Sequence, residues 1–333
     1  MNKDEFLFGC KDIKQRFSGW ISNGILSHAY LIEGPSGSGK KSLAKYIAAS
    51  LVCVGNCDEC NICHRISEGH CPDIKFISRE EGQKNISVDA VREMIDDTPL
   101  TPTELDFKMY VFDGAEKLSA QAQNSLLKVI EEPPSGVYIL LLCESSANIL
   151  TTVKSRVQRV VMPLLSRDEV FEYLRAKSVP EFLYDEKKLD FAVRLSGGAP
   201  GKAEKLLSDG EKEYSTFLSA KAIIDAQSKK NRGISEYDML NTVSKAMPGR
   251  EEADRLFSML ALAYRDILSS KLTGKVKDGF WTEDEAEKYV LALPLETLQK
   301  SVEAITALAY DSNYNFNITL AASALSVLLW RAA

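Results

Sequence analysis

The stretch that decides the fold runs from Ala29-Tyr30-Leu31-Ile32 into Gly34-Pro35-Ser36-Gly37-Ser38-Gly39-Lys40. The apolar run predicts a buried strand, and we expect a helix over 40–51 after the glycines. The spacing fits G-x-x-x-x-G-K, in which glycines let backbone N–H groups converge on a phosphate and the lysine reaches the outer phosphates. Its position between a strand and a helix favours a phosphate-binding loop over a glycine-rich turn of another kind.

The residue after Lys40 departs from this pattern. Such loops hold magnesium through a Ser or Thr at that position, whereas this sequence has Lys41, with Ser42 one place later. One residue along a helix turns a side chain by about 100°, so Ser42 points elsewhere. The sequence leaves open whether the loop binds nucleotide, and whether Lys41 fills the magnesium position with its own charge. The predicted, degenerate nucleotide site comprises Gly34, Gly37, Gly39, Lys40, Lys41, Ser42 and Asp113.

A second strand supports the phosphate-loop interpretation. The run 109–112 is apolar and ends in Asp113, the type of residue that holds magnesium in P-loop enzymes; a helix-capping or turn role is the alternative. Many of these enzymes place a water-orienting Glu next, but here the residue is Gly114, and Glu116 lies two places further on. Because a glycine cannot polarise water, we expect no meaningful ATP hydrolysis at this chain's own site.

The rest of the chain suggests an α/β domain followed by helices. Strands expected at 74–77, 137–143 and 157–161 alternate with helical patterns at 87–95 and 119–130, which predicts a parallel sheet with helices on both faces. Beyond residue 208 only helical periodicity is present. We therefore expect a P-loop domain over 1–162, a small helical domain over 163–207 and an all-helical domain over 208–333.

Composition limits the partners and the compartment. The chain has 333 residues, 45% of them hydrophobic, and its net charge of −6 argues against holding nucleic acid alone through a basic surface. We see no export signal, and the longest apolar stretch, 318–330, is too short to cross a bilayer. The sequence therefore predicts a cytoplasmic protein.

Four of the seven cysteines lie within eleven residues, at Cys53, Cys57, Cys60 and Cys63. Four thiolates at such short spacing can converge on one tetrahedral ion, and a closed four-sulfur site is characteristic of structural Zn²⁺. Free thiols or redox pairs are the alternative. His64 and Cys71 are nearby spare ligands, whereas Cys10 and Cys143 have the pattern of ordinary buried thiols.

An arginine follows the strand predicted at 137–143. Arg156 lies in the run Thr152-Val153-Lys154-Ser155-Arg156, where it could face the nucleotide of a neighbouring subunit and stabilise charge on a transferring phosphoryl group. A lone surface arginine is more often simply solvated, and Arg159 competes for the same role. Ser145 and Asn148 either contact a γ-phosphate or cap the next helix.

These motifs together resemble a known family. His28-Ala29-Tyr30-Leu31, the glycine loop, the cysteine cluster, Pro72-Asp73 and above all the run 124–134, NSLLKVIEEPP, resemble bacterial clamp-loader subunits of the AAA+ class. The run Lys154-Ser155-Arg156-Val157 is similar to the S-R-C motif of that family, with Val in place of Cys. The resemblance covers residues 1 to about 207, and Pro200-Gly201-Lys202 lies where ATPase members have a nucleotide-sensing arginine.

The resemblance implies a fold and a role. The fold is an AAA+ P-loop domain with a parallel sheet, a helical lid domain and a C-terminal helical collar domain that assembles subunits. The role is that of a non-hydrolysing stator in the DNA polymerase III holoenzyme, a DNA-directed DNA polymerase and nucleotidyltransferase. Its implied partners are gamma/tau and delta subunits in a hetero-pentamer, which loads a sliding clamp on primed DNA.

Site residues also follow from the resemblance. Arg156 becomes the finger lent in trans to a neighbouring ATPase subunit. The four cysteines of 53–63 become the zinc ligands, although the first gap is short and Cys71 is a substitute for Cys53. Two rival hypotheses remain open at this point. One is an active ATPase that uses Ser42 and Glu116, and the other is a stand-alone nucleotide-sensing adaptor.

Overall fold

The computed structural model separates into two compact units. It describes residues 3–53, 60–80, 82–177, 185–208, 210–230, 233–275, 279–312 and 317–333. The first unit is Met1–Lys177 with Gly198–Lys202, and the second is Ser178–Gly197 with Ala203–Ala333. The division at 162 and 207 expected from the sequence stays a prediction.

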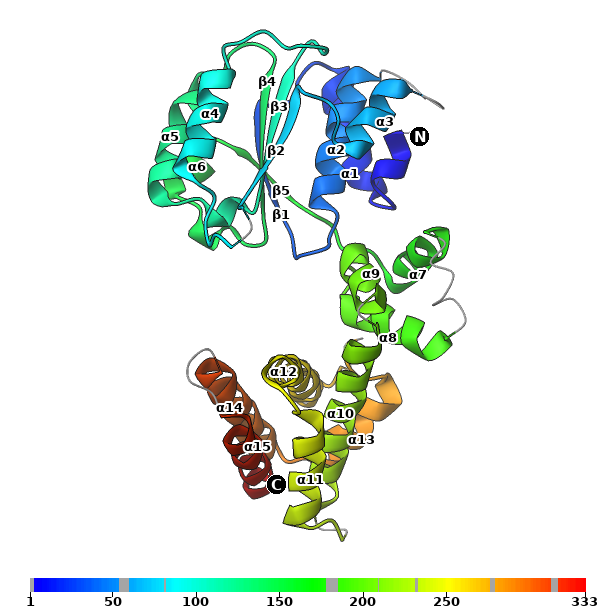
Figure 1. The fold of residues 1–333 in the computed structure, drawn as a ribbon. Coiled ribbons are helices and arrows are strands. Elements are labelled where there is room, and N and C mark those ends of the chain that lie inside the picture. Colours follow the sequence, from blue (N-terminus) through cyan, green and yellow to red (C-terminus); the bar gives the residue numbers. More distant parts are fainter. Residues whose placement is uncertain are drawn as a thin grey trace. The chain divides into compact units, whose positions relative to one another are not determined.

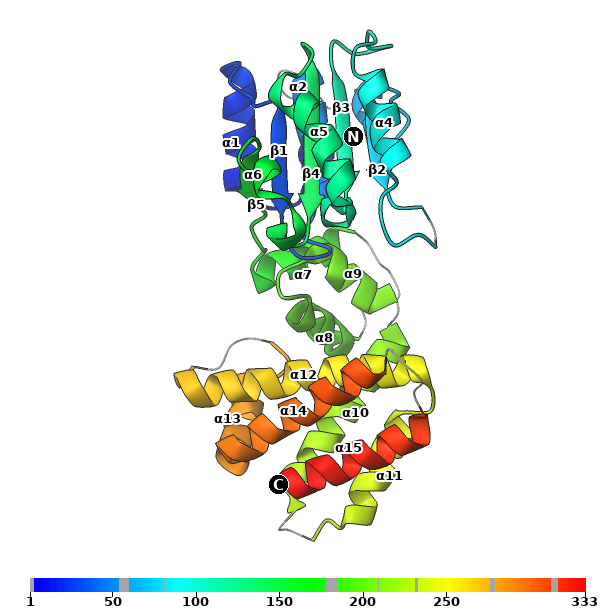
Figure 2. The same ribbon diagram turned by 90° about the vertical axis from the view of Figure 1, so that its left-hand side faces the viewer.

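The first unit is built on a five-stranded parallel sheet. Its strands stand in the order β2-β3-β4-β1-β5, so β1 lies between β4 and β5 (Figure 2). Most side chains of the three central strands β3, β4 and β1 are buried, because helices cover both faces, and these strands therefore read as nearly continuous apolar runs in the sequence, whereas the edge strands β2 and β5 are largely not buried. Their bounds are β1 Ala29–Glu33, β2 Ile74–Ser78, β3 Lys108–Asp113, β4 Val137–Cys143 and β5 Gln158–Val161.

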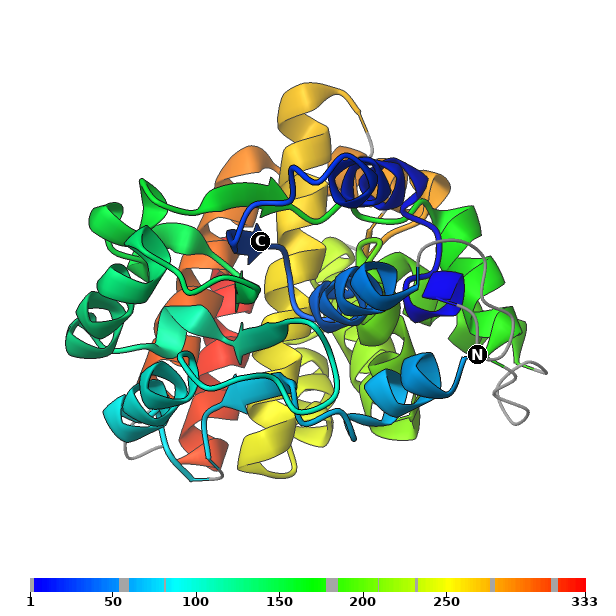
Figure 3. The ribbon, with the colours of Figure 1, turned by 90° about the horizontal axis from the view of Figure 1, so that it is seen from above.

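Two rows of helices enclose this sheet. Helices α1, α2 and α3 lie along one face and α4, α5 and α6 along the other (Figures 1 and 3). Ser87 and Ser119 cap α4 and α5 by accepting hydrogen bonds from the backbone N–H groups of Ala90 and Ala122. The bounds are η1 Lys3–Phe6, α1 Lys11–Ser22, α2 Lys40–Val52, α3 Asn61–Glu68, α4 Val88–Asp97, η2 Ala115–Lys117, α5 Ala120–Glu131, η3 Ser146–Asn148, α6 Thr151–Lys154 and α7 Arg167–Ala176.

Every element named in the second unit is a helix. Its bounds are α8 Glu186–Ser196, α10 Gly210–Ser228, α11 Glu236–Ala246, α12 Arg250–Thr273, α13 Glu283–Ala292, α14 Leu295–Asp311 and α15 Ile318–Ala332, while α9 Pro200–Ser208 begins in the first unit. In its core, the ring of Phe280 packs against the rings of both Phe217 and Trp281. The buried Gln227 donates to Leu329 O and accepts from the Tyr264 hydroxyl, which ties α10 to α15 and α12. The expectation of a helical carboxyl-terminal part is confirmed.

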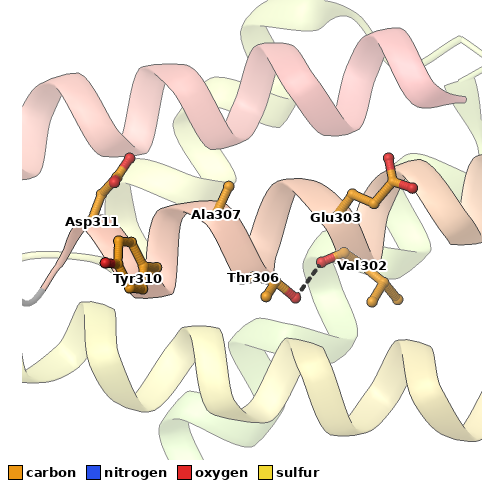
Figure 4. A pocket seen from close by; sticks show the side chains of 6 residues that line it. All are labelled: Val302, Glu303, Thr306, Ala307, Tyr310 and Asp311. Carbon is orange, nitrogen blue, oxygen red and sulfur yellow. Dashed lines mark hydrogen bonds between the residues drawn. The ribbon is translucent and has the colours of Figure 1, made fainter.

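The surface of α14 carries an open pocket. Its lining residues all come from that helix, in the region flanked by α12 and α15 (Figure 4). They are Val302, Glu303, Thr306, Ala307, Tyr310 and Asp311. Among the described helices, none is both long enough and apolar enough to span a bilayer.

Candidate functional site

The glycine loop connects β1 to α2 at the carboxyl edge of the sheet. Gly34 N–H donates to Cys143 O at 3.1 Å, which fixes the start of the loop beside β4. Gly37 and Gly39 have φ angles of +76° and +91°, a region that L side chains rarely adopt. This backbone turns the chain from the strand into the helix, as the sequence pattern predicts. Ligands of such sheets bind where the strand order reverses, which here is the β1–β4 boundary.

Another segment of the same chain, at Gly201 and Lys202, packs directly on the loop. Gly201 N–H donates to Gly37 O at 2.9 Å. A Cβ at Gly37 would lie 2.4 Å from Lys202 N, and a Cβ at Gly201 would lie 3.1 Å from Gly37 Cα. A side chain at Gly37 would therefore force the two backbones apart, whereas one at Gly201 would need its neighbour to move by a few tenths of an ångström. The Pro-Gly-Lys run singled out in the sequence is thus part of the wall of the phosphate loop.

Lys40 is folded onto the loop that precedes it. Its Nζ donates to Gly34 O at 2.6 Å and to Pro35 O at 2.9 Å. Burial lowers the pKa of the Lys40 ammonium, and neighbouring carboxylates oppose that shift without cancelling it. These carboxylates belong to Glu144, Asp113 and Glu116. The lysine therefore sits within reach of an anion in the loop while its charge is balanced by three acids.

Lys41 forms an ion pair with the acid at the end of β3. Its Nζ lies 2.8 Å from Asp113 Oδ2, and the two side chains are 58% and 32% exposed. Magnesium requires oxygen ligands, and this pair instead places an ammonium next to the one carboxylate that would hold the ion. Ser42 lies one position further along α2 and is half-buried. The residues present therefore do not fit a magnesium ion.

The turn after Asp113 explains the missing water-orienting glutamate. Gly114 has a φ of +86° and donates its N–H to Leu142 O at 3.0 Å. A glutamate at this position would be strained, because its backbone would have to adopt the left-handed conformation that L residues rarely adopt. Glu116 lies in η2, and its Oε2 is buried with no hydrogen-bond partner in the described part of the chain. The turn thus supplies no acid at position 114.

Two acids at this edge were not singled out in the sequence. Burial raises the pKa of Glu33, but hydrogen bonds from Ser146 and Arg159 outweigh it and leave that pKa lowered. Glu144 is exposed at the end of β4 and acts on Lys40. Glu33 ends a buried strand and Glu144 directly follows one. This position at the carboxyl edge of the sheet is the sequence feature that could have identified them as site residues. Ser145 caps η3 by accepting from Ala147 N–H, and Asn148 O accepts from Gln123.

The two arginines of the β5 corner have different partners. Arg159 Nε donates to Glu33 Oε2 at 3.0 Å, so this guanidinium is held against the strand that leads into the loop. Arg156 Nε donates to Glu131 Oε1 at the end of α5, and its Nη1 donates to Thr152 O at 3.0 Å. The Arg156 side chain is 39% exposed and its partner 46% exposed. Arg156 is therefore the arginine of this pair that is not anchored to β1.

Three of the four clustered cysteines converge. Cys53 Sγ lies 3.4 Å from the Sγ atoms of both Cys60 and Cys63, and all three lie within 4.8 Å of one another. In a tetrahedral zinc site with Zn–S bonds of about 2.3 Å, sulfur atoms stand about 3.8 Å apart, so the donor set fits a metal ion. Cys57 lies outside the described residues. Cys71 is buried and is not in this group, and His64 pairs with Glu68.

Comparison with known proteins places this geometry in a family. Residues 9–166 match the family model described as "DNA polymerase III, delta subunit". This match spans 158 of the 333 residues of the chain, and over that range the chain is similar to the family. The family resemblance stated from the sequence is confirmed over this range, which contains the glycine loop, the cysteine cluster and Arg156. The parallel sheet and the helices that follow it confirm the predicted class, an AAA+ domain followed by helical domains.

Individual DNA polymerase III subunits show the same relationship. The chain is 34% identical over 192 residues to subunit delta' of Pseudomonas aeruginosa, covering 56% of this chain and 58% of that protein. It is 27% identical over 263 residues to subunit delta' of Bacillus subtilis, covering 77% and 76%. It is 29% identical over 303 residues to subunit gamma of Buchnera aphidicola from Acyrthosiphon pisum, covering 83% and 81%. The first of these matches spans little more than half of the relative's length.

Proposed function

We propose that this chain is a delta-prime-like subunit of the DNA polymerase III clamp loader, which does not hydrolyse ATP itself and lends Arg156 to a neighbouring ATPase subunit. One observation carries the proposal. The glycine loop between β1 and α2 is present, but the two positions that hydrolysis needs carry Lys41, paired with Asp113, and Gly114, whose φ is +86°. Delta' and gamma subunits among the relatives support membership of the same assembly.

The exposed position of Arg156 supports its role in trans. A guanidinium that completes another subunit's site has to be reachable from outside, and the Arg156 side chain is 39% exposed. Arg159 is 56% exposed but is held by Glu33, which is only 17% exposed, whereas Glu131, the partner of Arg156, is 46% exposed. Arg156 follows the short helix α6, Thr151–Lys154, and contacts Glu131 at the end of α5. The proposed partners are gamma/tau and delta subunits in a hetero-pentamer, with sliding clamp and primed DNA engaged through the complex. In this proposal the lid is 163–207 and the collar 208–333.

The test is reconstitution with the cognate gamma/tau and delta subunits, clamp and primed DNA. Arginine fingers contribute about 10³-fold or more to phosphoryl transfer, so Arg156→Ala should reduce turnover at the neighbouring site by about that factor. Arg159→Ala is the matched control. It removes the other arginine of the same corner, the one that pairs with Glu33. Wild-type ATPase activity in the Arg156→Ala complex would refute the finger role. Phosphate release by the purified chain alone would refute the stator role.

We also propose that the cysteine cluster holds one structural Zn²⁺, with Cys57 as the fourth ligand. The convergence of the Cys53, Cys60 and Cys63 sulfurs supports this. Elemental analysis of the purified chain should give about one zinc per molecule. Cys63→Ser should lose it, whereas Cys71→Ser should retain it, because Cys71 lies outside the cluster. Zinc-free wild-type protein, or equal loss in both variants, would remove the site.

A further inference from the structure

The acid at the end of β3 has a cation within the chain itself. In phosphate loops of this type, magnesium bridges the loop hydroxyl, that acid and the nucleotide phosphates. Here Lys41 Nζ lies 2.8 Å from Asp113 Oδ2, and it stands at the sequence position of the hydroxyl ligand. A dication at the same place would be repelled by the ammonium and would lack one oxygen ligand. Lys41 thus excludes the metal and substitutes for part of its charge.

An ammonium can also perform the bridging part of the metal's task. It carries three N–H donors, and one of them is sufficient for the contact with Asp113. The Lys41 side chain is 58% exposed on a flexible four-carbon stem, so its remaining donors can turn toward an anion in the loop. A lysine there holds a phosphate as a single positive charge and does not activate water. This agrees with a loop that binds without hydrolysing.

The loop retains the features that bind an anion. Gly37 and Gly39 have left-handed backbones, and the N-cap of the 13-residue helix α2 has no side-chain hydrogen bond to it. The first N–H groups of such a helix, together with its dipole, favour a phosphate. Ser38, within the loop, is 3% exposed, and its Oγ has no hydrogen-bond partner in the part of the chain that the structure describes. This hydroxyl packs against Gly34, since a Cβ built there would lie 2.9 Å from Ser38 Oγ.

We infer that this loop binds a nucleoside diphosphate or triphosphate as the metal-free anion, with the Lys41–Asp113 ion pair in place of magnesium. The inference rests on the proposed function only in treating the loop as a nucleotide site, and it does not depend on Arg156. The loop itself departs from the usual phosphate-loop pattern at one residue, Lys41, which stands at the position of the Ser or Thr. A single substitution should therefore convert the site to the metal-dependent form.

The experiment uses the purified full chain and fluorescent ADP and ATP analogues, titrated in EDTA and again in excess Mg²⁺. The wild-type dissociation constants should agree within about twofold between the two buffers. Lys41→Thr should bind at least about tenfold more weakly in EDTA and recover in Mg²⁺, because the hydroxyl restores the metal ligand. Lys45→Thr is the charge-matched control on the same helix; its lysine donates to Ser67 O and should not affect metal dependence.

Each other outcome overturns the inference. Wild-type binding that requires Mg²⁺ would show that the ion displaces Lys41. No binding in either buffer would show that the loop is only a structural element. Circular dichroism and a thermal melt establish that Lys41→Thr is folded, which we expect because the residue is exposed. Neither failure touches the Arg156 experiment, which reads ATPase activity of the reconstituted complex, so failure of the proposed function is separately recognisable.

Discussion

The phosphate loop and the Arg156 corner lie in the same α/β unit, yet they are built in opposite ways. In the loop, backbone touches backbone at Gly37 and Gly201, and both lysines contact groups of the same chain. At the corner, Arg156 is exposed and its carboxylate partner, Glu131, is exposed as well. In the loop both lysines have partners within the chain while the buried Ser38 hydroxyl has none among the described residues, whereas at the corner both members of the ion pair are exposed.

This difference suggests how a nucleotide-binding fold can change roles. Tight packing around the glycines preserves the loop's shape whatever chemistry its side chains perform, so Lys41 can replace a metal ligand without loss of the scaffold. Glu33 lies between the two regions. It ends β1 beside Gly34, and it pairs with Arg159, the other arginine of the corner, which leaves Arg156 to pair with Glu131. Three variants test this difference between the loop and the corner.

The largest effect on stability should come from the loop glycine. Gly37→Ala should destabilise the chain by about 3 kcal/mol, because the new Cβ meets Lys202 N and the residue keeps a left-handed backbone. Gly24→Ala is the matched control, since its φ is +66° but no atom lies within 4 Å of the new Cβ, and it should cost about 1 kcal/mol. Urea-induced unfolding measures both. Equal costs would mean that the contact with 201–202 contributes nothing.

An intermediate effect should come from Glu33. Its folded pKa is lowered, so its contribution is fully present above the ordinary carboxyl pKa of about 4.5 and is lost as the pH falls through the lower folded value. Glu33→Gln should therefore unfold at lower urea concentration at pH 7, by about 1–2 kcal/mol. The gap to wild type should narrow below pH 4.5. A gap that stays constant from pH 7 to pH 3 would contradict the assigned charge.

The smallest effect should come from Glu131. Exposed ion pairs contribute roughly 0–1 kcal/mol, so Glu131→Gln should change the free energy of unfolding by less than about 0.5 kcal/mol, and this difference should shrink at high salt. In the reconstituted complex it should retain ATPase activity within about threefold, because Arg156 itself remains. A loss above about 1.5 kcal/mol would instead assign the corner a structural role in this chain.

The sequence predicted the elements better than the contacts between them. The strand at 137–143 was correct at both ends, because a buried parallel strand reads as an uninterrupted apolar run. Helix α3 was missed, since its residues overlap the cysteine cluster and were interpreted only as a metal loop. The approach of Gly201 to Gly37 joins residues far apart in the chain, and no local pattern reports it.

The site was partly predictable for the same reason. Lys41 and Asp113 were both named, because parallel strands bring their carboxyl ends to one edge. The direct contact between Lys41 and Asp113 was not predicted. Strands β1 and β3 are separated by β4, and the two residues meet only because the lysine side chain is long. Glu33 and Glu144 were not singled out because acids at strand ends are common.

Helix α2 begins at Lys40, directly after the glycine loop, and its C-cap is Cys53, the first sulfur of the cysteine cluster. These 13 residues span about 20 Å. Lys45 Nζ additionally donates to Ser67 O, which ties the middle of this helix to the cysteine-bearing segment. The proposed zinc site and the proposed anion site therefore lie at the two ends of one helix. On these proposals, we expect removal of the zinc to weaken anion binding at the N-terminus of α2.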